Sequence, residues 1–156
     1  MHSLFVLAFI TGVAALQSRC KTSPSDYDWP SAEDWSNLNA TIDGVLIKTK
    51  PAASSCYPGN PFNSSLSCAV IEENWSYADF QAILPEGTGA PIWANNSCLP
   101  PTASGYLSNK ECKVGGAPAY VVNATSEEQI ATAMKWASSR NIRIVVKGTG
   151  HDLNGR

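Results

Sequence analysis

A strand–helix–strand pattern between residues 119 and 147 constrains the fold of this 156-residue chain more than any other feature. Residues 119–123 and 143–147 are short apolar runs rich in β-branched residues, as is typical of strands. The residues between them have the apolar spacing of an amphipathic helix. Two strands joined by a helix within about thirty residues predict a βαβ unit with parallel strands and a right-handed crossover.

The helix of this unit has both a start signal and an apolar face. Overlapping capping boxes pair Thr125 with Glu128 and Ser126 with Gln129. Asn141 is a candidate for the residue that ends the helix. The apolar face has the spacing i, i+3, i+4, i+7 and consists of Ile130, Ala133, Met134 and Ala137.

A glycine-rich stretch follows the second predicted strand, at the carboxyl edge where α/β proteins usually bind ligands. Its glycines, with Lys147 before them and Arg156 at the end, would let backbone amides approach an anion closely. An ordinary exit from strand to loop is the alternative. The spacing does not fit a dinucleotide fingerprint, and Arg156 stands where a phosphate-binding P-loop requires lysine. The glycines are Gly148, Gly150 and Gly155.

The amino terminus has the composition of a secretory signal. An apolar run of twelve residues extends from Leu4 to Ala15, broken only by Thr11 and Gly12, and small and polar residues follow it. This run is too short to cross a bilayer, which takes about 20 apolar residues. We therefore expect residues 1–17 to be a cleaved signal peptide, and a buried N-terminal helix is the alternative.

Glycosylation sequons and cysteines favour the same destination, the secretory pathway. The five cysteines lack the spacing of a metal site, so disulfide bonds are the favoured use. Four of them can be paired in fifteen ways, and the most local pairing joins Cys56 to Cys68 and Cys98 to Cys112, which leaves Cys20 unpaired. The five Asn-X-Ser/Thr sequons are at Asn39, Asn63, Asn74, Asn95 and Asn123.

Residues 18–118 are expected to form a disulfide-rich, glycosylated segment, and its part from 52 to 118 is expected to be loop-rich and disulfide-stapled rather than a second core. Its first helix is predicted to begin at Ser31, with Asp34 as the capping partner. A short strand over 45–49 and a helix over 67–75 are also predicted. Several aromatic residues lack periodicity, which favours packing on the neighbouring segment over an aromatic binding surface; these are Trp75, Phe80, Trp93 and Tyr106.

Charge and composition argue against several functions. A formal charge of -2 without a long basic run gives no reason to expect nucleic acid binding. The chain has no stretch apolar and long enough for a stable membrane span and no spacing of metal ligands. A hydrophobic content of 44% is consistent with a folded core.

The sequence resembles fungal FAD-linked oxidoreductases similar to berberine bridge enzyme, within the vanillyl-alcohol oxidase superfamily. The specific match is VVKGTGHDLNGR at 145–156, and supporting matches are YVVNAT at 120–125, IWANNSC at 92–98 and WPS at 29–31. The resemblance implies an α+β fold, in which one βαβ unit begins a truncated PCMH-type FAD-binding domain at residues 119–156. The loop-rich, disulfide-stapled segment precedes it.

In that family the loop lies against the FAD pyrophosphate, and its histidine bonds covalently to the 8α-methyl carbon of the flavin. The resemblance therefore implies that His151 attaches FAD, a role that suits the nucleophilic nitrogen of neutral imidazole. Asp152 is implied to orient the imidazole or to cap the next turn. The other implied cofactor-binding residues are Lys147, Gly148, Thr149, Gly150, Gly155 and Arg156.

Members of the family pass a hydride from a small-molecule substrate to the flavin, which dioxygen reoxidises, often in fungal secondary metabolism or alkaloid biosynthesis. They are several times longer than this chain, which lacks their substrate domain and catalytic base. No catalytic residue is therefore assigned, and the truncated chain is expected to be inactive alone. The alternative is a small secreted, disulfide-bonded glycoprotein with a non-catalytic binding or structural role.

Overall fold

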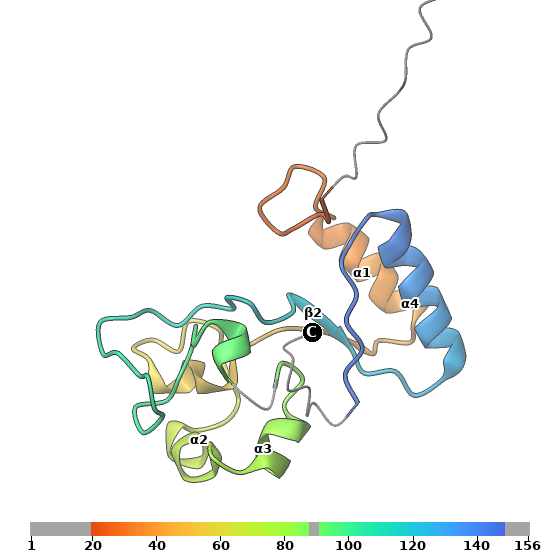
Figure 1. Ribbon diagram of the computed structural model, residues 1–156. Coiled ribbons are helices and arrows are strands. Elements are labelled where there is room, and N and C mark those ends of the chain that lie inside the picture. Colours follow the sequence, from red (N-terminus) through yellow and green to blue (C-terminus); the bar gives the residue numbers. More distant parts are fainter. Residues whose placement is uncertain (1–19, 88–90, 149–156) are drawn as a thin grey trace, which may run out of the picture.

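The computed structural model describes residues 20–87 and 91–148, and these form an α+β fold of short elements (Figure 1). The predicted signal peptide at 1–17 lies outside the described residues. Among the described residues, no helix has the length and apolar character needed to cross a membrane. In chain order the elements are α1 (Ala32–Thr41), β1 (Leu46–Lys48), the 3-10 helix η1 (Ala52–Cys56), α2 (Cys68–Asn74), α3 (Ala78–Ile83), the 3-10 helix η2 (Pro91–Ala94), β2 (Tyr120–Val122) and α4 (Glu127–Ser139).

The two longest helices, α1 and α4, begin at the capping residues that the sequence indicates. At α1, Ser31 Oγ accepts a hydrogen bond from Asp34 N, and the Asp34 carboxylate accepts one from Ser31 N at 2.9 Å. At α4, Ser126 Oγ accepts from Gln129 N, while Gln129 Oε1 accepts from Thr125 N at 2.9 Å. Local hydrogen bonds therefore fix both helix starts, because they satisfy backbone N–H groups that have no partner inside the helix.

An aromatic cluster around Trp35 joins α1, α4 and the sheet, and Figure 1 shows the two helices side by side. Trp35 is only 8% exposed, and its ring stacks on Tyr120 of β2 with 3.9 Å between centroids. It also contacts Trp136 of α4 at 4.7 Å and Trp29, which precedes α1, at 5.5 Å. The buried residues that complete this core are Leu38, Ile42 and Ile142.

Strands β1 and β2 form a two-stranded antiparallel sheet. Its register places Leu46 opposite Val122, and the pairing continues beyond the strands, where Thr49 N donates to Ala119 O at 3.1 Å. The strands predicted over 45–49 and 119–123 are thus confirmed. Their pairing with each other joins two stretches far apart in the chain.

The predicted βαβ unit is wrong for the described chain, because residues 143–147 are not a strand and β2 pairs antiparallel with β1. The apolar side chains at 144–146 are 41%, 57% and 83% exposed. A strand needs a neighbour for its backbone N–H and C=O groups. Before this run lies one isolated parallel bridge, between Thr22 and Ile142. Within 20–87 and 91–148 the unit therefore consists of its first strand and its helix, without the parallel pairing or the crossover.

Residues 52–118, called here the cysteine-stapled segment, have a core of their own, so the expectation that this segment forms no second core is wrong. The two predicted disulfides are confirmed, since Cys56 is bonded to Cys68 and Cys98 to Cys112. Cys20 is a free, exposed cysteine. Helix α2 confirms a prediction, whereas α3, η1 and η2 were not predicted. The core consists of Ala52, Ala53, Ile71 and Leu84.

Aromatic side chains of the cysteine-stapled segment pack within it rather than onto α1 and α4. Trp75 and Phe80 lie against its core. Tyr106 meets Tyr57 edge to face with 6.2 Å between ring centroids, and the Tyr57 hydroxyl donates a hydrogen bond to Leu99 O at 2.9 Å. The prediction that these aromatic residues pack onto the neighbouring segment is therefore wrong for Trp75, Phe80 and Tyr106, whose partners are local, and the side chain of Trp93 lies outside the described ones.

Replacing Trp35 tests the importance of the aromatic cluster. We expect Trp35→Ala to lower the free energy of unfolding by about 3–5 kcal/mol, because it removes a buried ring that contacts three other aromatic rings. The measurement is a urea titration followed by far-UV circular dichroism. Tyr27→Ala is the control, because Tyr27 is fully exposed and its loss should leave the midpoint unchanged. Equal midpoints for both variants would contradict the assigned role of Trp35.

Candidate functional site

The candidate site begins where residues 143–148 meet helix α3 of the cysteine-stapled segment. Lys147 Nζ donates hydrogen bonds to Ala82 O at 3.0 Å and to Leu84 O at 2.7 Å. These carbonyls lie at the C-terminal end of α3, where backbone carbonyls lack intrahelical partners and attract cations. One side chain thus ties the start of the glycine-rich stretch to residues 65 and 63 positions earlier in the chain.

The surroundings of Lys147 act on its charge in opposite directions. Burial lowers the pKa of Lys147 below its usual value, and the nearby Glu86 carboxylate opposes that shift by favouring the charged form. Glu86 is itself held in place, because its Oε1 accepts a hydrogen bond from Ala52 N at 2.7 Å. The end of α3 and Glu86 together provide an acceptor-rich environment for an ammonium group.

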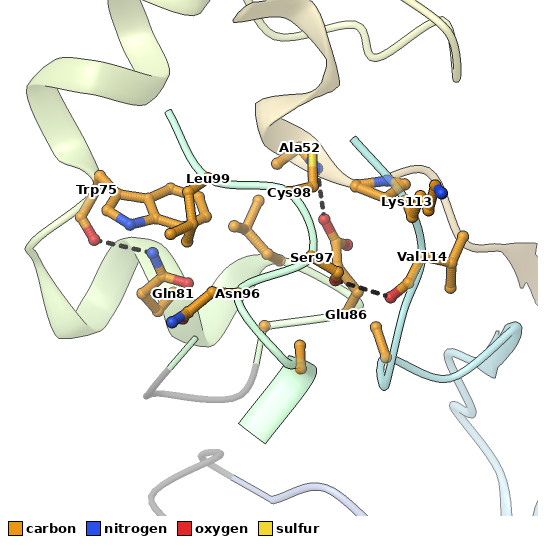
Figure 2. Close-up of a pocket in the computed structure, with 15 residues that line it drawn as sticks. Ala52, Trp75, Gln81, Glu86, Asn96, Ser97, Cys98, Leu99, Lys113 and Val114 are labelled. Carbon is orange, nitrogen blue, oxygen red and sulfur yellow. Dashed lines mark hydrogen bonds between the residues drawn. The ribbon is translucent and has the colours of Figure 1, made fainter. Parts of the chain in front are cut away.

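A small cavity lies beside this contact, between α3 and the loops at 94–99 and 113–117 (Figure 2). Gln81 Nε2 donates to Trp75 O at 2.8 Å on one side of it. Its volume is about 50 Å³, enough for one or two waters at about 30 Å³ each. Pockets for small-molecule ligands typically measure about 300–1,000 Å³, so this cavity alone does not hold a flavin.

Two glycines near Lys147 have contrasting surroundings. Gly87 N donates to Leu84 O at 3.0 Å, and a Cβ at Gly87 would lie 1.9 Å from Gln81 O, so the turn after α3 requires glycine. Gly148 is different, because a Cβ there would meet nothing within 4 Å. The one glycine of the predicted loop that the structure describes therefore faces open space, where another group can approach its backbone.

Of the predicted cofactor-binding residues, the structure describes Lys147 and Gly148. Sequence reasoning missed Glu86 and Gly87, although the Pro-Glu-Gly sequence at 85–87 is a recognisable turn signal after α3. In the part of the chain that the structure describes, no cluster of side chains is suited to a metal ion. The remaining predicted residues lie outside the described residues and stay predictions; they are Thr149, Gly150, His151, Asp152, Gly155 and Arg156.

The five predicted glycosylation sites all lie among the described residues. Asn63, Asn95 and Asn123 are exposed. Asn39 and Asn74 are half-buried, and the side chain of each makes a hydrogen bond of 2.9 Å with a backbone group. The sites therefore differ in how much solvent surrounds the side-chain amide.

Comparison with known proteins identifies the class of domain to which the glycine-rich stretch belongs. Residues 118–156 match the FAD binding domain family. The fold agrees with this match, because it resembles the VAO-type flavoprotein MtVAO615 from Myceliophthora thermophila with a TM-score of 0.76 and 36% identity. That match covers 88% of this chain and 25% of the flavoprotein. MtVAO713 from the same organism gives a TM-score of 0.75 with 38% identity, over 88% of this chain and 24% of that protein.

The chain is homologous to the amino-terminal part of fungal FAD-linked oxidoreductases, as the resemblance implied. It is 42% identical to the FAD-linked oxidoreductase apf9 of Gibberella fujikuroi, over 97% of this chain and 24% of the relative. With the FAD-linked oxidoreductase hmp9 of Hypomyces subiculosus it shares 38% identity, over 90% of this chain and 22% of the relative. The chain thus spans about a quarter of the length of the curated relatives it matches. These matches support FAD as the cofactor.

Two glycine substitutions test which glycine is required for stability, the one in the turn after α3 or the one in the glycine-rich stretch. We expect Gly87→Ala to destabilise the chain by about 1–3 kcal/mol, because its Cβ would collide with the Gln81 carbonyl. Gly148→Ala should change the free energy of unfolding by no more than about 0.5 kcal/mol, because its Cβ has room. Urea unfolding of both variants checks this. A Gly148→Ala variant as unstable as Gly87→Ala would show that the open space at Gly148 is wrongly placed.

Proposed function

We propose that this chain forms the first part of the FAD-binding unit of a secreted oxidoreductase that acts on a small molecule. The observation that carries the proposal is the match of residues 118–156 to the FAD binding domain family. Similarity to FAD-linked oxidoreductases over 97% of the chain supports it further. A place in fungal secondary metabolism, including alkaloid pathways, follows from the same resemblance and is part of the proposal.

The described residues Lys147 and Gly148 are compatible with the start of a flavin-binding loop. Lys147 holds the chain against α3, and Gly148 leaves its backbone open to an approaching group. His151 is proposed to bond covalently to the flavin through a ring nitrogen, for which the neutral imidazole is needed. When bound, FAD supplies the hydride acceptor of the reaction.

Oxidation of a substrate is proposed to require sequence in addition to residues 1–156. The chain spans about a quarter of its relatives, and no residue of it is assigned as a catalytic base. The apolar run at 144–146 is largely exposed in the described chain, although such a run is typical of a buried strand. The proposal is therefore that the chain supplies cofactor binding and that it is inactive by itself.

Covalent attachment is tested on a chimera in which residues 1–156 replace the matching amino-terminal part of the FAD-linked oxidoreductase apf9. We expect a yellow, flavin-fluorescent band that survives acid precipitation and denaturing electrophoresis, and we expect His151→Ala to abolish the band. His2→Ala is the matched control, because His2 is the other histidine and lies in the predicted signal peptide. A wild-type protein that loses all its flavin in acid would refute attachment at His151.

Secretion is proposed from the apolar run at residues 4–15 and from the sequons. Expression in a eukaryotic secretory host should give a mature protein that begins near residue 18 and carries N-linked glycans. We expect Asn63, Asn95 and Asn123 to be occupied more fully than Asn39 and Asn74, because the first three are exposed. Amino-terminal sequencing and glycopeptide mass spectrometry measure both. An unprocessed, unglycosylated product would contradict the proposed location.

A further inference from the structure

We propose that Lys147 is a positioning residue that clamps the entrance of the flavin loop onto α3, and that its ammonium is not a ligand of the cofactor's phosphates. The proposal deepens the proposed function, and it rests on that function only for the assignment of the residues after Lys147 to a flavin-binding loop. The clamp itself is a contact between two described parts of the chain, so it can be tested without any cofactor.

The acceptors of the clamp are two carbonyls with no other role inside the helix. Ala82 O and Leu84 O receive Lys147 Nζ at 3.0 and 2.7 Å, at the end of α3. Leu84 O also accepts from Gly87 N at 3.0 Å, so the turn that follows α3 shares an atom with the clamp. Carbonyls at a helix C-terminus favour a cation, and here two of the three N–H donors of Lys147 are used on them.

The acceptor site is fixed from behind by the cysteine-stapled segment. Gln81 is 7% exposed and donates to Trp75 O at 2.8 Å, which holds the last turn of α3 against its neighbour. Glu86 accepts from Ala52 N at 2.7 Å and brings a negative charge near the ammonium. Figure 2 shows both of these hydrogen bonds beside the small cavity. The carbonyls that receive Lys147 therefore belong to a supported turn rather than to a loose loop.

Within residues 20–87 and 91–148, the structure shows few other contacts for the run that carries Lys147. Val146 is 83% exposed, and a Cβ at Gly148 would meet nothing within 4 Å. Moving the ammonium to a phosphate would remove its hydrogen bonds from Ala82 O and Leu84 O, and Leu84 O would keep only the bond from Gly87 N. A hydrogen bond to a charged group contributes about 1.5–3 kcal/mol, so the clamp and a phosphate contact are competing uses of one side chain.

The first experiment measures amide hydrogen exchange in the full chain without cofactor. Lys147→Met should raise the exchange rate at Gly87, whose N–H donates to the clamped Leu84 O, by about tenfold, the effect of losing a hydrogen bond to a charged group. Lys147→Arg keeps the charge and the donors and should restore protection to within about threefold of the wild type. Lys135→Met is the matched control, because Lys135 is exposed on α4 and should leave the rate at Gly87 unchanged.

The second experiment asks whether an anion draws Lys147 away from α3. Saturating inorganic pyrophosphate, the probe for the cofactor's phosphates, should leave exchange at Gly87 in the wild type unchanged. Faster exchange at Gly87 on adding pyrophosphate would overturn the proposal, because it would mean that Lys147 leaves α3 for the anion. Unchanged rates in Lys147→Met without pyrophosphate would overturn it as well. If the wild type does not bind pyrophosphate, that result counts against the proposed flavin loop, while the first experiment still decides the clamp.

Discussion

The antiparallel pairing of β1 with β2 is the contact on which the rest of the structure depends. It places Leu46 opposite Val122, and Thr49 N continues the pairing to Ala119 O. The pairing closes the chain between these strands into one long loop, which contains the cysteine-stapled segment. Closing a loop costs entropy that grows slowly with its length, and the two disulfides divide this loop further, with separations of 12 and 14 residues. The ladder thus sets apart two small cores.

The packing of α1 and α4 against the β1–β2 sheet depends on one aromatic ring, that of Trp35. Trp35 stacks on Tyr120 and contacts Trp136, so a residue near the amino terminus fixes both the second strand and the helix after it. Gln129 adds a polar tie, because its Nε2 donates to the Asp43 carboxylate at 3.1 Å. Helix α4 is therefore placed by tertiary contacts as well as by its own cap.

Local signals in the sequence were sufficient for the starts of α1, α2 and α4. The disulfide pairing observed is the most local of fifteen arrangements that the sequence left open, and contacts between distant segments were not predictable from it. Ser31 and Ser126 cap as their sequences indicate, because capping involves residues only three apart. Residues 143–147 have a strand composition, yet strand formation depends on a neighbour that sequence does not reveal. For the site, composition singled out Lys147, but its acceptors are backbone carbonyls, which every residue type carries.

The bridge at Ile142 and the hydrogen bonds of Lys147 explain how the glycine-rich stretch can have a defined starting point without a sheet to support it. The run from 143 to 148 is preceded by the bridge between Thr22 and Ile142, and near its end Lys147 is bound to α3. Between these two points the backbone has no regular secondary structure and its apolar side chains are exposed. In this arrangement a backbone bridge sets where the run begins, and one charged side chain sets where the glycine-rich stretch begins.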